Sequence, residues 1–388
     1  MDKATSYELD PSVVPELSVI SAEYDSVDYS VTPAGRAVDQ IASGINETLF
    51  PPSVIDINQI MSGGVPIDGI PPIDSPQYLK PAEATYIESS EPVVSIEVNG
   101  DARAFPIKVL MSHEIVNTEI GGIPITVTYC PLCNSALAYD RRVGDRVLDF
   151  GVSGTLYNSA LIMYDRPTGS LWGHFTGEGF VGHYAGLQLS LIPTQTLSFG
   201  EFTAAMGDAM VLSNESEHGI RAYSRNPYIG EDSSPGTSGM LFRGTVDERL
   251  PRKERVVGIF DYGGSAIAIP FEVLNERRVV VLDKDSKNGL VVFYIDGLSS
   301  PLDTSNISQG RDVGQTGVFK PAANGQKLTF KNQPDGETFT DDQTGSTWNI
   351  LGRAIDGELQ GAVLEPVAHL DAFWFAWAAY RPDTEIYS

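Results

Sequence analysis

The residues with the clearest potential chemistry are Cys130 and Cys133, the only two cysteines of the 388-residue chain, in the segment Tyr-Cys-Pro-Leu-Cys at 129–133. On a tight turn, both thiolates of such a pair project to the same side and can chelate one soft metal ion. The same spacing lets the two sulfurs close a redox disulfide. Two thiolates alone do not complete a structural zinc site, so a bound metal needs at least one further ligand.

Histidine is the natural third ligand, and His113 is the histidine that a single hairpin would bring back toward Cys130. The sequence therefore predicts a mononuclear Cys2His site that holds one transition-metal ion, copper or zinc in preference to iron. A fourth position left open would allow redox or hydrolytic chemistry. Glu114, which follows His113, is a candidate for a further ligand or a base.

Other side chains are expected to support this site. His174 follows a tryptophan that is expected in the core, and His369 opens an aromatic segment that is expected to form a helix packed on the core. Both histidines are candidates for additional site residues. The residues expected to orient the ligands through hydrogen bonds are Asn117, Ser153 and Tyr157.

Two other functions remain open from the residues alone. The cysteine pair without a metal would make the chain a thiol–disulfide oxidoreductase. In the other alternative, the chain is a structural or surface-assembly protein in which residues 1–50 contact a neighbouring subunit. No Walker loop, nucleophile elbow or His-Glu-x-x-His motif occurs, so the sequence leaves open whether the protein is an enzyme.

The elements that position the cysteines are predicted to be two β-hairpins joined by a short helix. The turn signals are Asn99-Gly100 and Gly121-Gly122, and residues 107–116 fit the helix between the hairpins. The last strand delivers Cys130 at its end. The expected strands span residues 93–98, 102–107 and 123–129.

The chain repeats two of its segments in the same order. Residues 93–110 resemble residues 256–274, and residues 163–193 resemble residues 339–366 through the pattern Asp-x-x-Thr-Gly-Ser-x-Trp. Two matching blocks in one order indicate an internal duplication. Because the second copy carries no cysteine, the predicted site belongs to the first copy only.

The repeat and the high content of glycine and proline predict the fold class. We expect a β-rich fold, all-β or α+β, made of two pseudo-twofold related β-barrel-like or β-sandwich-like units with short helices. The expected parts are an extended N-terminal arm at 1–50, a first unit with the cysteine site at 51–213, a connecting loop at 214–250 and a second, degenerate unit at 251–388.

Charge and hydropathy exclude two classes of partner. The formal net charge of -25 repels phosphate backbones, so we expect no nucleic-acid partner. No run of about 18 apolar residues occurs, so we expect no transmembrane segment. The first residues do not have the pattern of an export signal. The partner is otherwise an unspecified small molecule or protein, with self-association through residues 1–50 as one expectation.

Several motifs follow one another between residues 50 and 388. They are Pro66–Pro71, Ala102–Pro106, His113–Asn117, Val127–Cys133, Phe150–Gly154, Asp165–Trp172, Phe373–Trp377 and Pro382–Thr384. In these motifs and their order, the chain resembles an uncharacterised family, the "domain of unknown function 3179" family. Members are often exported, so the resemblance implies an extracytoplasmic location, whether periplasmic, secreted or at the cell surface. The resemblance implies an acidic residue where Thr118 stands and glutamine where His174 stands.

Overall fold

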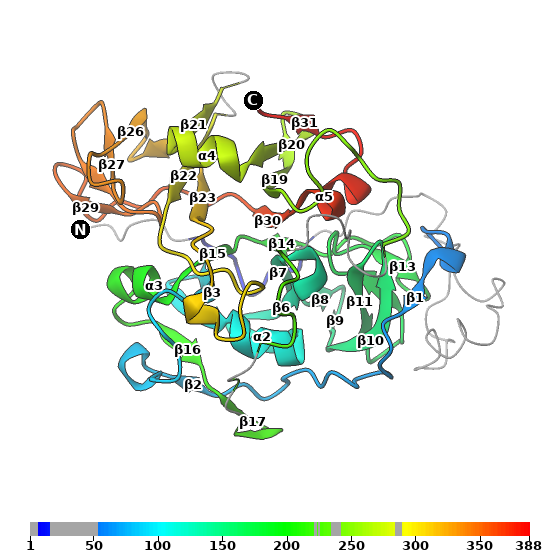
Figure 1. The fold of residues 1–388 in the computed structure, drawn as a ribbon. Coiled ribbons are helices and arrows are strands. Elements are labelled where there is room, and N and C mark those ends of the chain that lie inside the picture. Colours follow the sequence, from blue (N-terminus) through cyan, green and yellow to red (C-terminus); the bar gives the residue numbers. More distant parts are fainter. Residues whose placement is uncertain (1–6, 16–52, 221–222, 224–225, 234–241, 284–288) are drawn as a thin grey trace.

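The computed structural model describes residues 7–15, 53–220, 223, 226–233, 242–283 and 289–388. Within them the chain is rich in β-strands and has only short helices, which confirms the predicted β-rich fold class (Figure 1). The α-helices are α2 (Ile107–His113), α3 (Phe199–Ala205), α4 (Phe271–Arg277) and α5 (Trp374–Tyr380). Of the predicted N-terminal arm, only residues 7–15 lie among the described residues.

The first predicted hairpin lies in the middle of a five-stranded sheet. Its strands are β2 (Tyr78–Leu79), β3 (Pro92–Val98), β4 (Asp101–Pro106), β15 (Gln195–Ser198) and β16 (Met210–Leu212). They follow the order β15-β3-β4-β16-β2, and β16 runs parallel to β4. The turn forms because Asn99 and Gly100 accept φ angles of 51° and 78°, which match the twist of a two-residue hairpin.

The second predicted hairpin belongs to a four-stranded sheet, and one strand of this sheet ends at Cys130. Its strands are β5 (Ile115–Ile120), β6 (Ile123–Cys130), β7 (Ser135–Asp140) and β14 (Leu191–Ile192), in the order β14-β7-β6-β5. Gly121 and Gly122 form the turn with φ angles of 57° and 80°. A small hairpin of β8 (Arg142–Val143) and β9 (Arg146–Val147) follows β7.

Helix α2 is shorter than the sequence predicted. It was expected to reach residue 116, but it ends at His113, because Glu114 has a φ of 57° that a right-handed helix does not allow. Ile115 and Val116 are β-branched and join β5, where the pleated sheet accommodates them better than a helix does. The strand therefore begins directly after Glu114.

The third sheet covers the cysteines from another side. Its strands are β1 (Met61–Ser62), β10 (Phe150–Tyr157), β11 (Ala160–Asp165), β12 (Leu171–Gly173) and β13 (Gly179–Val181), in this order. The turn between β10 and β11 consists of Asn158 and Ser159, both with positive φ. The carbonyl oxygen of Ser159 faces the cysteine sulfurs.

We call residues 53–213 the first half and residues 251–388 the second half. The strands of the second half are β19 (Arg255–Tyr262), β20 (Ser265–Pro270), β21 (Val279–Leu282), β22 (Leu290–Ile295), β23 (Gln315–Phe319), β24 (Ala322–Ala323), β25 (Gln326–Lys327), β26 (Phe330–Asn332), β27 (Phe339–Asp341), β28 (Thr347–Trp348), β29 (Ala354–Asp356), β30 (His369–Phe373) and β31 (Glu385–Ile386). They form sheets in the orders β30-β19-β20-β31, β21-β22-β23 and β26-β27-β28-β29, with β24 paired to β25.

The succession of elements in the first half recurs in the second half. A hairpin, a helix and an antiparallel pair follow one another as β3-β4-α2-β5-β6 and again as β19-β20-α4-β21-β22. In each half, the strand that follows the last helix pairs in parallel with the second strand of the first hairpin. These pairs are β16 with β4 and β31 with β20. A pseudo-twofold relation and a common origin of the halves stay predictions.

The repeated pattern Asp-x-x-Thr-Gly-Ser-x-Trp has one structural role in both halves. The carboxylate of Asp165 accepts hydrogen bonds from the indole Nε1 of Trp172 at 2.9 Å and from the backbone and hydroxyl of Thr168. Asp341 accepts the same bonds from Trp348 and Thr344. Because both indoles are fully buried, each aspartate provides the partner that a buried N–H needs.

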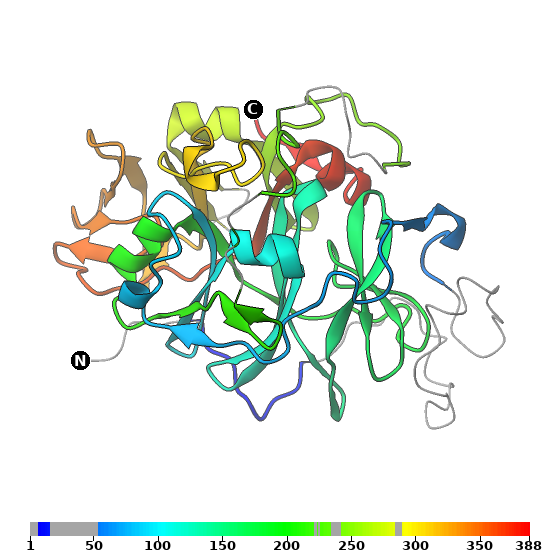
Figure 2. The same cartoon turned by 60° about the horizontal axis from the view of Figure 1, so that its bottom comes forward.

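The two halves interlock instead of standing side by side. β30 of the second half lies against β7 of the first, and β15 of the first half lies against β23 of the second. In both views the red C-terminal segment with β30 and α5 lies against the green strands of the first half (Figures 1 and 2). The largest hydrophobic core accordingly joins side chains of β6, β7 and α5.

The remaining described elements are short. The 3-10 turns span Ile57–Gln59, Pro81–Glu83, Pro131–Cys133 and Ile307–Gln309, and a small hairpin pairs β17 (Glu215–Ser216) with β18 (Gly219–Ile220). This hairpin lies in the predicted connecting loop 214–250. No helix among the described residues is both long and apolar enough to cross a membrane.

Candidate functional site

Cys130 and Cys133 stand at the two ends of one tight turn. Cys130 is the last residue of β6, Pro131 opens the 3-10 turn, and Cys133 closes it. Proline suits the first position because its fixed φ is already that of a helical turn. Asn134 then leaves the turn in the left-handed region, with φ of 50° and ψ of 47°, which asparagine tolerates better than most residues. The sequence of the turn thus directs both sulfurs to one point.

The two sulfurs share a buried, polar environment. Cys130 is 2% exposed and Cys133 is fully buried, and both are free thiols. The carbonyl oxygen of Ser159 lies 3.7 Å from the Sγ of Cys130 and 3.4 Å from the Sγ of Cys133. The thiols also hydrogen-bond to each other. The pair is therefore held close enough to act as one chemical unit.

The surroundings of the two thiols shift their pKa values in opposite directions. Burial alone would raise the pKa of Cys130, but hydrogen bonds from the Cys133 thiol and from backbone N–H groups, including that of Leu161, lower it below the usual range of a thiol. Burial and the hydrogen bond to Cys130 raise the pKa of Cys133 well above that range. Cys130 is consequently the more acidic thiol of the pair and Cys133 the less acidic one.

Glu114 is the acidic group beside Cys130. Its backbone is fixed at both ends, because its N–H donates to Leu110 at 2.6 Å and its carbonyl accepts from Tyr129 at 2.8 Å. Its carboxyl is buried, with 8% of the residue exposed. Burial, followed by the negative charge of Cys130, raises the pKa of Glu114 to about 8. At neutral pH this side chain therefore carries a proton beside Cys130.

Further groups around the pair come from distant parts of the chain. Burial raises the pKa of Tyr228, in the connecting segment, and the negative charges of Glu114 and Cys130 raise it further. Tyr380 of α5 feels both cysteines and donates its hydroxyl to the carbonyl of Tyr157 at 2.7 Å. Lys253, the cation that lowers the pKa of Cys133, has a 6% exposed side chain and pairs with Glu231 at 2.5 Å.

His113 is held by other partners than the cysteines. Its Nδ1 lies 2.6 Å from the carbonyl oxygen of Pro71 and its Nε2 lies 2.8 Å from the hydroxyl of Tyr223. The ring also stacks on His218, with 5.6 Å between the centroids. Both ring nitrogens of His113 are thus engaged in hydrogen bonds in this arrangement.

His174 is a buried structural histidine in this arrangement. Its Nδ1 lies 3.0 Å from the hydroxyl of Thr128, and its Nε2 lies 2.8 Å from the hydroxyl of Ser135. Burial lowers the pKa of His174 to about 3, so the ring is neutral at physiological pH. The two hydroxyls come from neighbouring strands of one sheet, and His174 joins that sheet to the loop after β12.

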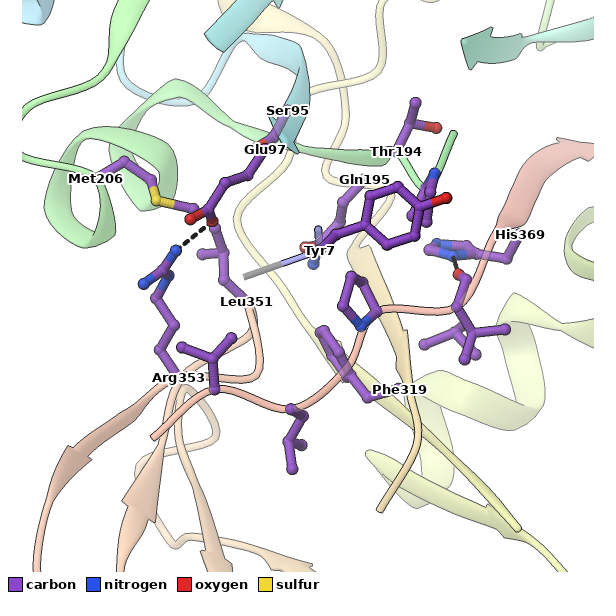
Figure 3. Close-up of a pocket in the computed structure, with 16 residues that line it drawn as sticks. Tyr7, Ser95, Glu97, Thr194, Gln195, Met206, Phe319, Leu351, Arg353 and His369 are labelled. Carbon is purple, nitrogen blue, oxygen red and sulfur yellow. Dashed lines mark hydrogen bonds and ion pairs between the residues drawn. The ribbon is translucent and has the colours of Figure 1, made fainter. Parts of the chain in front are cut away.

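His369 lies in a different cavity, between the two halves. This cavity has a volume of about 60 Å³, and neither cysteine lines it. Figure 3 shows His369 near Tyr7, with its Nδ1 directed to the carbonyl oxygen of Val367 at 2.8 Å. An ion pair between Glu97 and Arg353 closes the other end of the cavity.

The residues predicted to orient the ligands are bonded mainly to the backbone. Asn117 bonds to both backbone groups of Phe150, and Ser153 donates to the carbonyl of Ile162 at 2.6 Å. The backbone carbonyl of Tyr157 accepts a hydrogen bond from the hydroxyl of Tyr380 at 2.7 Å. Thr118, where the resemblance implies an acidic residue, bonds to the hydroxyl of Tyr78 at 2.7 Å.

The geometry thus gathers Cys130, Cys133 and Glu114 from the predicted set. Across the described residues, no group of three or more His, Cys, Asp or Glu side chains is arranged to hold a metal ion. Reasoning from sequence did not identify three neighbours of the pair, Tyr228, Lys253 and Glu231. The segment after residue 226 is rich in charged residues. This composition does not show that Tyr228, Lys253 and Glu231 fold against the cysteine turn.

A comparison with models of protein families identifies the family of the chain. The model of a protein family of unknown function, DUF3179, matches residues 67–384. The chain belongs to this family. The match covers Glu114, the cysteine turn and nearly all of the second half. No curated protein and no solved structure matches the chain. The description of DUF3179 assigns no activity, so the function is argued from the geometry of the cysteine pair.

Proposed function

We propose that Cys130 and Cys133 form a thiol–disulfide redox centre that exchanges with a disulfide of low molecular weight. One observation carries the proposal: two hydrogen-bonded free thiols on one turn, one with a lowered pKa and one with a raised pKa. An attacking thiol works best as a thiolate, and a second thiol within reach resolves the mixed disulfide. The first half alone carries this arrangement.

The proposed reaction is balanced in atoms and electrons. The Cys130 thiolate attacks one sulfur of the added disulfide, which forms a mixed disulfide and expels one thiolate. Cys133 loses its proton and attacks the Cys130 sulfur, which closes the internal disulfide and expels the second thiolate. The two cysteines lose two electrons, and the added disulfide gains them and becomes two thiols.

Glu114 is proposed as the proton carrier of this exchange. With a pKa of about 8 it is protonated at pH 7 and can protonate the first thiolate that leaves beside Cys130. The carboxylate that results then accepts the proton of Cys133.

The burial of the pair limits the size of the reactant. Only 2% of Cys130 is exposed, so a folded protein cannot place its own disulfide against this sulfur in the conformation described. A small disulfide needs a much smaller opening. The extracytoplasmic location that the family resemblance implies belongs to the same proposal, because that environment keeps disulfides oxidised.

A redox titration of the purified chain tests this proposal. We expect one internal disulfide to form reversibly, with a midpoint potential between about −120 and −270 mV, the range of known thiol–disulfide exchange proteins. The oxidised fraction is measured by alkylation of the remaining thiols and mass spectrometry. The single variants Cys130→Ser and Cys133→Ser form no internal disulfide. Thiols that stay reduced throughout this range in the folded wild-type chain would contradict the proposal.

The role of Glu114 has its own test. The rate of disulfide exchange by the wild-type chain should show a step near pH 8, where Glu114 loses its proton, and Glu114→Gln should remove this step and slow exchange below pH 8 by about tenfold or more. Glu119→Gln is the matched control, because Glu119 is exposed on the neighbouring strand. An unchanged pH profile in Glu114→Gln would show that another group carries the proton.

Metal binding is the second candidate function, and one observation favours it. The Cys-Pro-Leu-Cys turn brings both sulfurs to the same carbonyl oxygen, so two soft ligands already converge. The predicted copper or zinc site with His113 would require this histidine to exchange its present hydrogen bonds for a metal. Elemental analysis of gently purified protein decides between the candidates. About one ion per chain, lost in the Cys130→Ser/Cys133→Ser double variant, supports metal binding over disulfide exchange.

A further inference from the structure

The turn between β10 and β11 presents its backbone to both cysteines. The carbonyl oxygen of Ser159 lies 3.4 Å from the Sγ of Cys133 and 3.7 Å from that of Cys130, so the S–H of either thiol can donate to it. Ser159 is fully buried, so this contact is made away from water. Oxidation of the pair removes both S–H groups, and the carbonyl loses the bonds that the dithiol makes. The turn therefore stabilises the dithiol relative to the disulfide.

The conformation that directs this carbonyl to the sulfurs is costly. Asn158 and Ser159 have φ angles of 49° and 64°, in the left-handed region that residues other than glycine seldom adopt. The turn contains no glycine, in contrast to the hairpin turns at Gly100 and Gly122. Such a conformation persists only where the surrounding structure holds it.

Tyr380 of α5 supplies one of these holding contacts from the second half. Its hydroxyl donates at 2.7 Å to the carbonyl of Tyr157, the residue directly before the turn. The ring of Tyr380 stacks on Phe175, with 4.7 Å between the centroids, and meets the ring of Tyr157 in a T-shaped arrangement at 6.1 Å. Figure 1 shows α5 in red beside the sheet that contains β11. Both ring contacts fix the direction of the hydroxyl toward the end of β10.

We infer that Tyr380 is a positioning residue for the cysteine pair, which holds the Asn158–Ser159 turn so that the carbonyl of Ser159 favours the dithiol. This inference rests on the proposed disulfide exchange and identifies what regulates its equilibrium. A couple whose reduced form is stabilised accepts electrons more readily, so the contact makes the pair a stronger oxidant. The second half, which has no cysteine, thereby sets the redox equilibrium of the first half.

Equilibration of the full chain with a glutathione redox buffer tests this role. The variant Tyr380→Phe loses one oxygen atom and keeps an aromatic ring for the contacts with Phe175 and Tyr157. We expect its equilibrium between dithiol and disulfide to shift about threefold to tenfold toward the disulfide, as one weakened hydrogen bond implies. The fraction of internal disulfide is measured by alkylation of the remaining thiols and mass spectrometry.

Tyr78→Phe is the matched control and should leave the equilibrium unchanged. Its ring, like that of Tyr380, is partly buried against the largest core, and its hydroxyl lies 2.7 Å from that of Thr118, away from the turn. Ser159→Thr is a second test variant, because a β-branched residue resists a left-handed φ, and it should shift the equilibrium in the same direction as Tyr380→Phe. Hydrogen exchange of the amides at residues 158–161 should become faster in both test variants and stay unchanged in the control.

The possible failures are distinguishable. A wild-type chain that forms no reversible disulfide would overturn the proposed exchange and this inference with it. A wild-type chain that titrates, together with an unchanged equilibrium in Tyr380→Phe, would overturn the inference alone. A shift toward the dithiol in Tyr380→Phe would contradict the effect of the Ser159 carbonyl. Equal shifts in Tyr380→Phe and Tyr78→Phe would show a general effect of fold stability in place of a positioning role.

Discussion

Burial keeps two side chains near the cysteine pair neutral over most of the physiological pH range. His174 has its pKa lowered to about 3, and Glu114 has its pKa raised to about 8. In both cases burial is the first cause, because a charge loses more hydration than its neighbours restore. Of the two thiols, Cys130 is the one whose pKa is lowered, so it is the group of this site that ionises more readily than Cys133.

The substitution His174→Gln should make the protein more resistant to acid. Between pH 6.5 and 3 the unfolded chain binds a proton at His174 that the folded chain does not, so stability falls as the pH falls through this window. Glutamine can bond to both hydroxyls and does not titrate. Urea unfolding measures the difference in unfolding free energy between the variant and the wild type. We expect this difference to shift in favour of the variant by about 2–3 kcal/mol when the pH is lowered from 7 to 4.5.

His174→Phe separates this effect from the loss of hydrogen bonds. Phenylalanine leaves the hydroxyls of Thr128 and Ser135 without the ring nitrogens, so this variant should be less stable than His174→Gln at every pH. A difference between the glutamine variant and the wild type that does not change with pH would contradict the buried, neutral state of His174.

At this scale the sequence was informative where chemistry depends on spacing. The spacing of Cys130 and Cys133 predicted a shared turn, and Glu114 was a candidate because it follows His113 in the sequence. The role of His113 could not be predicted in the same way, because its partners are the carbonyl of Pro71 and the hydroxyl of Tyr223, which no local pattern indicates.

Among the elements, the Asp-x-x-Thr-Gly-Ser-x-Trp unit is the most self-contained. Its aspartate holds the turn and the buried indole together in both halves. Asp341→Ala should lower the unfolding free energy by about 2–4 kcal/mol, since the buried N–H of Trp348 and the backbone N–H of Thr344 lose their acceptor. Denaturant unfolding measures the loss.

Asp342→Ala is the control for this prediction. Asp342 is the next residue along the chain, but its side chain is 48% exposed and pairs with Lys331 on the surface, so its removal should cost much less stability than the removal of Asp341. Equal losses in the two variants would mean that the indole finds another acceptor when Asp341 is absent.

The hairpins were predictable because their turns have strong local signals, Asn99-Gly100 and Gly121-Gly122. The end of helix α2 was not, because the pattern of apolar residues continues through Ile115 and Val116. The competition between helix and strand at these residues is decided by the pairing of β5 with β6, which is a long-range contact.

In the molecule as a whole, the interlocked halves should unfold together. Gln195 of β15 donates to the carbonyls of Thr316 and Ile350 in the second half, at 2.8 and 2.9 Å. Gln195→Ala should therefore reduce the unfolding free energy by about 1–3 kcal/mol in both halves equally. Native-state hydrogen exchange of amides in β6 and β22 measures this.

Gln326→Ala, at an exposed position of β25, should leave both sets of amides unchanged. A loss of protection confined to β22 would show that the halves open independently. The sequence indicated two similar halves but not how they pack on each other, because the contacts of β7 with β30 join residues more than two hundred positions apart.

The position of β30 and α5 has a consequence for how the protein is made. Phe373, Phe375 and Trp377 belong to the core that surrounds the cysteine turn, and they are translated more than two hundred residues after Cys133. Until they emerge, the first half lacks part of its core, and the thiols remain open to oxidants and to wrong partners. A premature stop codon shortly before residue 369 would remove this part of the core, although every residue of the Cys-Pro-Leu-Cys turn had been translated.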